Sequence, residues 1–93
     1  MFDVNEYFDG KVKSIAFTVK GEPATIGVMA AGEYEFGTST VEHMTLISGS
    51  MAVMLPGEDS WRDIGLNETF VVDANVKFQV KLAEDSSYLC LYK

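Results

Sequence analysis

An alternation of apolar and polar residues that recurs along the whole chain constrains its fold more than any other feature. Between Val76 and Leu82 every second residue is apolar, and the residues between them are Lys77, Gln79 and Lys81. Successive side chains of a strand point to opposite faces, so a period of two indicates strands with one buried face. No stretch combines helical apolar spacing with capping residues. The chain is therefore predicted to be all-β.

Polar turn segments divide this pattern into short strands. We expect strands over Lys11–Lys20, Thr25–Met29, Glu33–Thr38, Glu42–Leu46, Met51–Leu55, Thr69–Val72, Val76–Leu82 and Tyr88–Tyr92. Many short strands separated by regular turns predict a small barrel or jelly roll of about eight to ten strands. With 93 residues and no internal repeat or linker, the chain is expected to form one domain, residues 1–93. A domain of this size buries its apolar surface poorly alone, so we also expect an oligomer.

Composition and charge exclude several classes of partner. The chain has 14 acidic residues against 7 Lys and Arg, and its net charge of −7 would repel the backbone of a nucleic acid. No apolar run approaches the roughly 18 residues of a membrane span. The first ten residues carry Asp and Glu instead of a basic segment followed by an apolar one, so we expect no signal peptide and a cytoplasmic protein. The single cysteine, Cys90, is expected to be a buried thiol without a disulfide.

A metal-site spacing is present without most of its ligands. From residue 36 the chain runs Phe36, one residue, Thr38, three residues, Glu42, six residues, Gly49. This spacing resembles the first cupin motif, H-x-H-x3-E-x6-G, with Phe36 and Thr38 where the histidines would stand. Residues 67–78 similarly resemble the second motif, G-x5-PxG-x2-H, with Phe78 in place of the histidine. Alternation independently puts Phe36, Thr38 and Phe78 on inward faces, and we therefore expect a cupin-type barrel.

The residues at these positions argue against a metal. The only histidine, His43, is adjacent to Glu42 and so faces the other side of its strand. Transition-metal sites usually need two or three convergent imidazoles or thiolates. We expect no metal cofactor, and an organic ligand in its place.

Glu42 is the candidate functional carboxylate. Beside Met44, and facing Phe36 and Phe78, it would be costly to bury unless something donates hydrogen bonds to it. Ribose or another polyol could donate them. A backbone amide, Thr38 or Thr45 could also do so, in which case the role of Glu42 is structural.

Aromatic residues and a few polar ones complete the candidate site. Tyr34, Phe36, Phe78 and Tyr88 are either core residues or rings between which a flat heterocycle stacks. Anion contacts could come from Arg62, Lys11 and Lys13, unless these basic residues lie on solvated strand faces. Thr38 and Thr40, with backbone amides, could also contact an anion. The chain has no catalytic-triad pattern and no glycine-rich phosphate loop.

Longer segments resemble a known family. The segments are NEYFDGKVKSI, GVMAAGEYEFGT, EHMTLISGSMAVMLP and SSYLCLY, in a resemblance that runs from Asn5 to Tyr92. They are similar to the small cupin-like pyrimidine/purine nucleoside phosphorylases. The resemblance implies an enzyme that converts purine or pyrimidine nucleosides and inorganic phosphate to free base and ribose 1-phosphate. It also implies a barrel that works without metal and a homodimer. One departure is Asp73-Ala74-Asn75, where a Pro-Gly turn is commoner.

Glu42 is the expected catalytic residue, and Arg62 and Lys13 are the weaker candidates for phosphate. The expected substrate-binding residues are Tyr34, Phe36, Thr38, Thr40, Met44, Phe78 and Tyr88. The alternative is a cupin that binds a small metabolite without catalysis, or a sugar isomerase or lyase.

Overall fold

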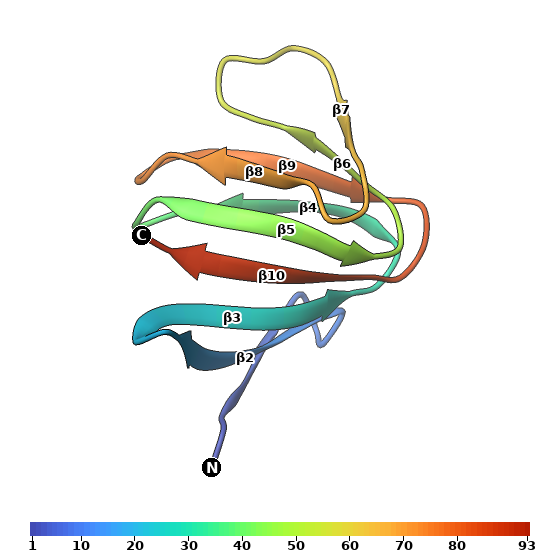
Figure 1. The fold of residues 1–93 in the computed structure, drawn as a ribbon. Coiled ribbons are helices and arrows are strands. Elements are labelled where there is room, and N and C mark those ends of the chain that lie inside the picture. The colour runs from blue at the N-terminus through green and yellow to red at the C-terminus, as the bar shows by residue number, and fades with distance from the viewer.

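The chain forms ten β-strands arranged in two antiparallel sheets, described for residues 1–93 by a computed structural model (Figure 1). The six-stranded sheet has the order β1-β2-β3-β10-β5-β8, with β1 Val4–Tyr7, β2 Val12–Val19, β3 Glu22–Met29, β10 Ser86–Tyr92, β5 Glu42–Ser48 and β8 Thr69–Val72. The four-stranded sheet has the order β4-β9-β6-β7, with β4 Gly32–Gly37, β9 Lys77–Leu82, β6 Met51–Met54 and β7 Arg62–Ile64. This all-β barrel confirms the predicted fold class.

Side-chain alternation determines which face of each strand is buried. In β9 the buried residues are Phe78, Val80 and Leu82, and the residues between them are at least partly exposed. On the other sheet, Met44 and Leu46 of β5 are buried in the same way. The inner faces of the two sheets meet in a core of 15 buried residues. In β5 and β9 the period of two seen in the sequence therefore predicted the inward faces correctly.

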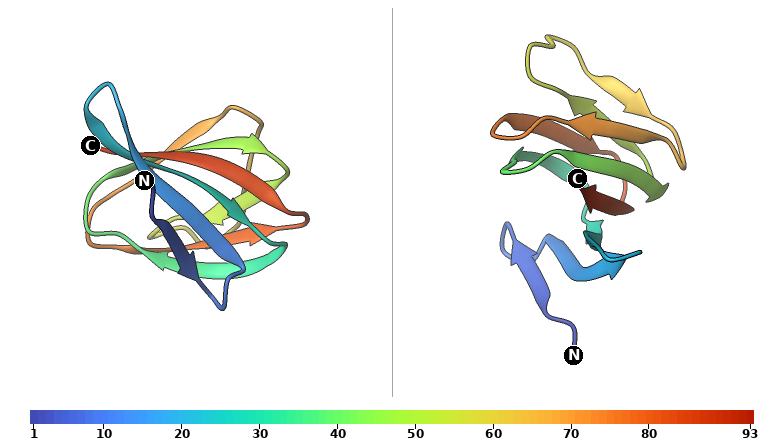
Figure 2. Two further views of the ribbon diagram at one scale, coloured as in Figure 1. Left: turned by 90° about the horizontal axis from the view of Figure 1, so that it is seen from below. Right: turned by 60° about the vertical axis from the view of Figure 1, so that its left-hand side comes forward.

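The N-terminal hairpin differs most from the sequence expectation. The first ten residues were not expected to contain a strand, yet Val4–Tyr7 pairs with β2 as β1. Figure 2 (right) shows β1 and β2 at one end of the molecule, below the rest of the barrel. A short edge strand with mostly exposed side chains carries too little alternation to be recognised in the sequence.

A second short edge strand was also missed. Arg62–Ile64 forms β7 at the end of the four-stranded sheet, beside β6.

The chain contains no helix long and apolar enough to cross a membrane.

Candidate functional site

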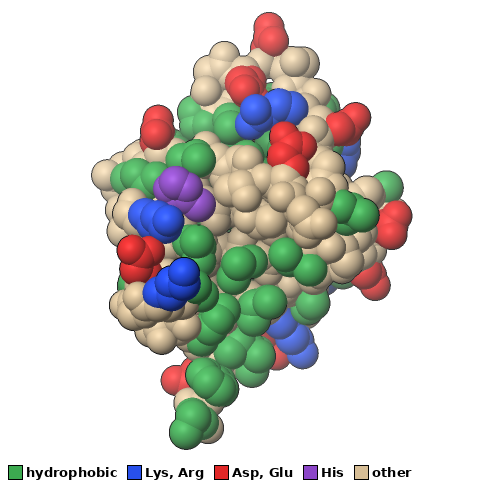
Figure 3. All heavy atoms as spheres, viewed as in Figure 1, with side chains coloured by type: hydrophobic (Ala, Val, Ile, Leu, Met, Phe, Trp, Pro, Cys, Tyr) green, Lys and Arg blue, Asp and Glu red, His purple; other side chains and the backbone are tan.

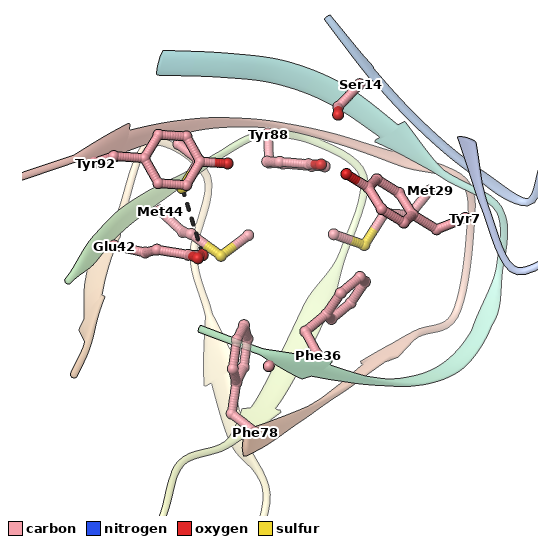
Figure 4. A pocket seen from close by; sticks show the side chains of 11 residues that line it. Tyr7, Ser14, Met29, Phe36, Glu42, Met44, Phe78, Tyr88 and Tyr92 are labelled. Atoms are coloured by element: carbon pink, nitrogen blue, oxygen red, sulfur yellow. Dashed lines mark hydrogen bonds between the residues drawn. The ribbon is translucent and has the colours of Figure 1, made fainter. Parts of the chain in front are cut away.

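A cavity of about 150 Å³ lies between the two sheets (Figure 4). It is lined by Tyr7, Ser14, Met29, Phe36, Gly37, Glu42, Met44, Phe78, Tyr88, Cys90 and Tyr92. These residues come from β1, β2, β3, β4, β5, β9 and β10, so the cavity exists only once both sheets have formed. No Lys, Arg or His lines it.

Glu42 is the only carboxyl group that lines this cavity. It is the first residue of β5, pairs with Tyr92 of β10 and is half-buried. Burial raises the pKa of Glu42 above its ordinary value, while a hydrogen bond with Cys90 acts in the opposite direction. The thiol of Cys90 donates that bond to Oε1 over 3.6 Å. The cavity thus holds a carboxyl group that keeps its proton to higher pH than a carboxyl in water does.

Two aromatic rings face Glu42 from the other sheet. Phe36 of β4 and Phe78 of β9 are directly paired, and their ring centroids are 5.8 Å apart at a tilt of 33°. Figure 4 shows both rings on the side of the cavity opposite Tyr88 and Tyr92. Phe78 is 1% exposed, whereas Phe36 is only partly buried. Phe36 is therefore the more accessible of the two rings, and Phe78 supports it from within the core.

Hydroxyl groups gather at the side of the cavity formed by β1, β2 and β10. Tyr88 and Ser14 both pair with Gly27, which lies between them on β3. Burial raises the pKa of Tyr88 to about 12, and the nearby hydroxyl of Ser14 opposes that shift. Tyr88 therefore stays protonated, as a hydrogen-bond donor, throughout the neutral range.

The remaining polar groups lie beside Glu42. Tyr92 shares a hydrogen bond of 3.0 Å with the hydroxyl of Thr25. Burial raises the pKa of Tyr92, and it raises that of Cys90 to about 12. Because a thiol reacts as its thiolate, this buried Cys90 is chemically inert and serves as a neutral donor.

Relatives of known sequence identify the family. A family model described as pyrimidine/purine nucleoside phosphorylase matches residues 2–92. The chain belongs to this family. A pyrimidine/purine nucleoside phosphorylase of Pseudomonas paraeruginosa is 60% identical over 93 residues, covering 100% of both chains. The expected family is therefore confirmed.

Solved structures support the same fold. A Vibrio parahaemolyticus protein of unknown function has a TM-score of 0.95 and 38% identity, with 100% of this chain and 99% of that chain covered. A cupin superfamily protein from Desulfitobacterium hafniense has a TM-score of 0.72 and 14% identity, with 95% and 82% covered. The second similarity shows the fold alone, and it is the cupin fold that the motif spacing predicted.

The cupin fold implies a metal, but the residues of this phosphorylase family member do not fit one. No three His, Cys, Asp or Glu residues come together in the structure. Phe36, Thr38 and Phe78 occupy the positions of the motif histidines, and phenylalanine has no donor atom for a metal. Glu42 has only the thiol of Cys90 beside it, too few ligands for a transition metal.

Some of the residues expected from the sequence line the cavity and some do not. Those that line it are Phe36, Glu42, Met44, Phe78 and Tyr88, and those that do not are Lys13, Tyr34, Thr38, Thr40 and Arg62. The hydroxyl of Tyr34 donates to the carbonyl of Ala30 over 2.6 Å instead. Thr38 lies beyond the end of β4, donates to the carbonyl of Asp73 over 2.6 Å and accepts a bond from the amide of Val76. Its hydroxyl thus anchors the turn between β8 and β9.

The two basic candidates face away from the cavity. Lys13 lies on the outer face of β2 and forms an ion pair of 3.2 Å with Glu6. Arg62 is exposed on β7, at the far edge of the four-stranded sheet. Thr40 is exposed in the loop before β5. None of the three contacts the cavity.

Six lining residues were not expected from the sequence: Tyr7, Ser14, Met29, Gly37, Cys90 and Tyr92. Alternation along the last strand could have found two of them, because Tyr88, Cys90 and Tyr92 share one face. Ser14 and Tyr7 carried no such signal. Their position depends on how β1 and β2 pair with the rest of the sheet.

Proposed function

We propose that this protein is a nucleoside phosphorylase that converts purine and pyrimidine nucleosides and inorganic phosphate to free base and α-D-ribose 1-phosphate. Family membership supports the reaction class. The observation that carries the proposal within this chain is the half-buried carboxyl of Glu42 in a cavity walled by Phe36 and Phe78. That arrangement suits a ligand with hydroxyl groups and a flat ring.

The sugar would be held by Glu42. Ribose hydroxyls donate hydrogen bonds, which would compensate the carboxylate for its loss of water. Cleavage of a glycosidic bond passes through a sugar with oxocarbenium character, and a nearby carboxylate stabilises the positive charge that develops. The inert thiol of Cys90 would orient this carboxylate through its bond to Oε1.

The base would stack on Phe36. Stacking needs a ring face and not a particular base edge. Neither Phe36 nor Phe78 can read the hydrogen-bonding edge of a base, and an apolar pocket discriminates only weakly between ring systems. Tolerance of both purines and pyrimidines follows from such a wall.

The size of the cavity suggests how a nucleoside would be placed. Its volume of about 150 Å³ is below the roughly 300–1,000 Å³ of common ligand pockets. We infer that the cavity encloses the reacting sugar and that part of the base extends out of it past Phe36, which is only partly buried.

A chromatographic assay tests this function. Uridine and adenosine are incubated with the full chain, with and without inorganic phosphate, and free base and ribose 1-phosphate are quantified. Release of both bases only with phosphate, in equal amount to ribose 1-phosphate, is the expected result. Base release that does not depend on phosphate would exclude phosphorolysis, and no release would favour a binding protein.

We also propose a homodimer formed through the outer face of the six-stranded sheet. Figure 3 shows hydrophobic side chains gathered on this face. Ile26, Val28, Ile47 and Val71 are exposed there by 42–55% of their surface, and the outward residues of β10 include Leu89 and Leu91. None of these six residues is charged in a chain with a net charge of −7, so two copies would repel least if they met here.

Sedimentation velocity tests the dimer. Val28→Glu puts a carboxylate into this face and should convert a dimer to a monomer, whereas Lys77→Glu, at an exposed residue of β9, should leave it dimeric. A monomeric wild-type protein would refute the proposal.

A cytoplasmic location is proposed as well, supported by the unpaired Cys90, because oxidising compartments favour disulfides.

A further inference from the structure

The hydroxyl groups of Ser14, Tyr88 and Tyr7 lie together at one side of the cavity. Figure 4 shows them across the cavity from Glu42, with the Tyr88 hydroxyl directed towards the other two. Ser14 and Tyr7 both lie close enough to the Tyr88 hydroxyl to affect its pKa. Ser14 is 4% and Tyr88 7% exposed, so both belong to the wall of the cavity rather than to the surface.

Gly27 makes this arrangement possible. It separates Ser14 from Tyr88 in the sheet, and a methyl group added at Gly27 would lie 2.6 Å from the Tyr88 hydroxyl oxygen. The ring of Tyr88 therefore lies against the bare backbone of β3. A side chain at position 27 would push the hydroxyl away from Ser14.

These hydroxyls remain available for a ligand. The hydroxyl of Tyr34 donates to a backbone carbonyl, whereas Figure 4 marks no hydrogen bond from Ser14, Tyr88 or Tyr7 to another residue of the cavity. With its pKa raised to about 12, Tyr88 can donate but does not ionise at neutral pH. Two buried donors and the half-exposed Tyr7 could thus point at one acceptor.

Charge decides what that acceptor can be. The cavity holds no Lys, Arg or His, and its only carboxyl group is Glu42 on the opposite side. In a poorly hydrated cavity an anion is repelled by a carboxylate and is stabilised by O–H donors. An anionic co-substrate would therefore bind at the hydroxyl side, away from Glu42.

We propose that Ser14 and Tyr88, with Tyr7, form the subsite for inorganic phosphate, the attacking tetrahedral oxyanion. This inference rests on the proposed phosphorolysis. A phosphate oxygen forms a bond with C1′ of the ribose while the bond between C1′ and the base nitrogen breaks. The electron pair of that bond leaves with the base, and the proton of hydrogen phosphate ends on the base nitrogen. Glu42 and the subsite would then flank the reacting sugar.

Steady-state kinetics of Ser14→Ala and Tyr88→Phe test the subsite. Each variant removes one donor, and a hydrogen bond to a charged group is worth about ten- to a hundred-fold in binding. The KM for phosphate at saturating uridine should rise by that factor. The KM for uridine at saturating phosphate should change by less than about two-fold. Ser60→Ala, in the exposed loop before β7, is the matched control and should change neither constant.

The opposite pattern would overturn the assignment. A raised KM for uridine with an unchanged KM for phosphate would mean that these hydroxyls hold the nucleoside. Circular dichroism and thermal unfolding of each variant establish that the barrel is intact before the constants are compared.

Direct binding separates this inference from the proposed function. Equilibrium dialysis measures radiolabelled inorganic phosphate on the wild-type chain and on the Ser14→Ala and Tyr88→Phe variants, in a buffer free of other oxyanions. If phosphate binds the wild type and is lost in both variants while base release needs no phosphate, the subsite stands and phosphorolysis fails. If base release needs phosphate but both variants bind it normally, phosphorolysis stands and the subsite fails. If the wild-type chain does not bind phosphate and releases base without it, both the subsite and phosphorolysis are refuted.

Discussion

The two sheets contribute different chemistry to the same cavity. The six-stranded sheet supplies every polar side chain that lines it: Tyr7, Ser14, Glu42, Tyr88, Cys90 and Tyr92. The four-stranded sheet supplies only Phe36, Phe78 and the backbone of Gly37. Hydrogen-bonding groups need fixed relative positions, and neighbouring strands of one sheet provide them through their register. A stacking wall needs only a ring face, so it can belong to a separate sheet.

The largest effect is expected on activity, from a substitution in the six-stranded sheet that supplies the polar side chains. Glu42→Gln keeps the shape of the side chain but removes its negative charge, so it should lower kcat by about 100- to 1,000-fold while the fold remains intact. Turnover of uridine and the thermal unfolding curve are the two measurements. Glu33→Gln, exposed on β4, is the matched control and should retain full activity. A Glu42→Gln variant with near-normal turnover would remove the carboxylate from the mechanism.

The next largest effect is expected on stability, from a substitution in the four-stranded sheet that supplies the aromatic rings. Phe78 is 1% exposed, and truncating a fully buried phenylalanine to alanine costs about 3–5 kcal/mol in the free energy of unfolding. Urea denaturation of Phe78→Ala measures this loss. Leu66→Ala, at a side chain 61% exposed, should change the free energy of unfolding by less than about 0.5 kcal/mol. An equal, small loss in both variants would mean that Phe78 does not support the wall.

Phe36 should affect binding more than stability. Phe36→Leu keeps an apolar side chain but removes the ring, and stacking of a base on an aromatic ring is worth about 1–3 kcal/mol. The KM for uridine and that for adenosine should both rise about ten-fold. Phe2→Leu, at an N-terminal residue 61% exposed, is the control. A change for only one nucleoside would show that the wall reads the base and does not merely stack on it.

The smallest effect concerns pH. The thiol of Cys90 donates to Glu42 and so lowers its pKa, against the larger upward effect of burial. Cys90→Ala removes this donor, so the pKa of Glu42 should rise further. If turnover needs the carboxylate, activity falls as pH drops through that pKa, and the acid limb of kcat/KM should move to higher pH.

Cys90→Ser provides the control for this shift. Serine keeps a donor at the same position, so its acid limb should return towards that of the wild type. A limb that stays in place or moves to lower pH in Cys90→Ala would contradict the proposed effect of the thiol on Glu42.

Local patterns in the sequence were enough to find the two aromatic rings and the carboxylate. A strand sends every second side chain to the same face, so Phe36 and Phe78 could be assigned to the interior without knowing the sheet order, and the motif spacing placed Glu42 beside them. The motif spacing added that the positions of metal ligands were filled by aromatic rings. The all-β cupin class followed from the same local information.

Only the tertiary structure decided which polar groups share the cavity. Ser14 meets Tyr88 because β2, β3 and β10 are neighbours and because Gly27 leaves space between them. Thr38 was expected inside, but its hydroxyl bonds to the turn between β8 and β9. Strand order, register and competition for hydrogen bonds join residues far apart in the chain, and the alternation of one strand contains no information about them.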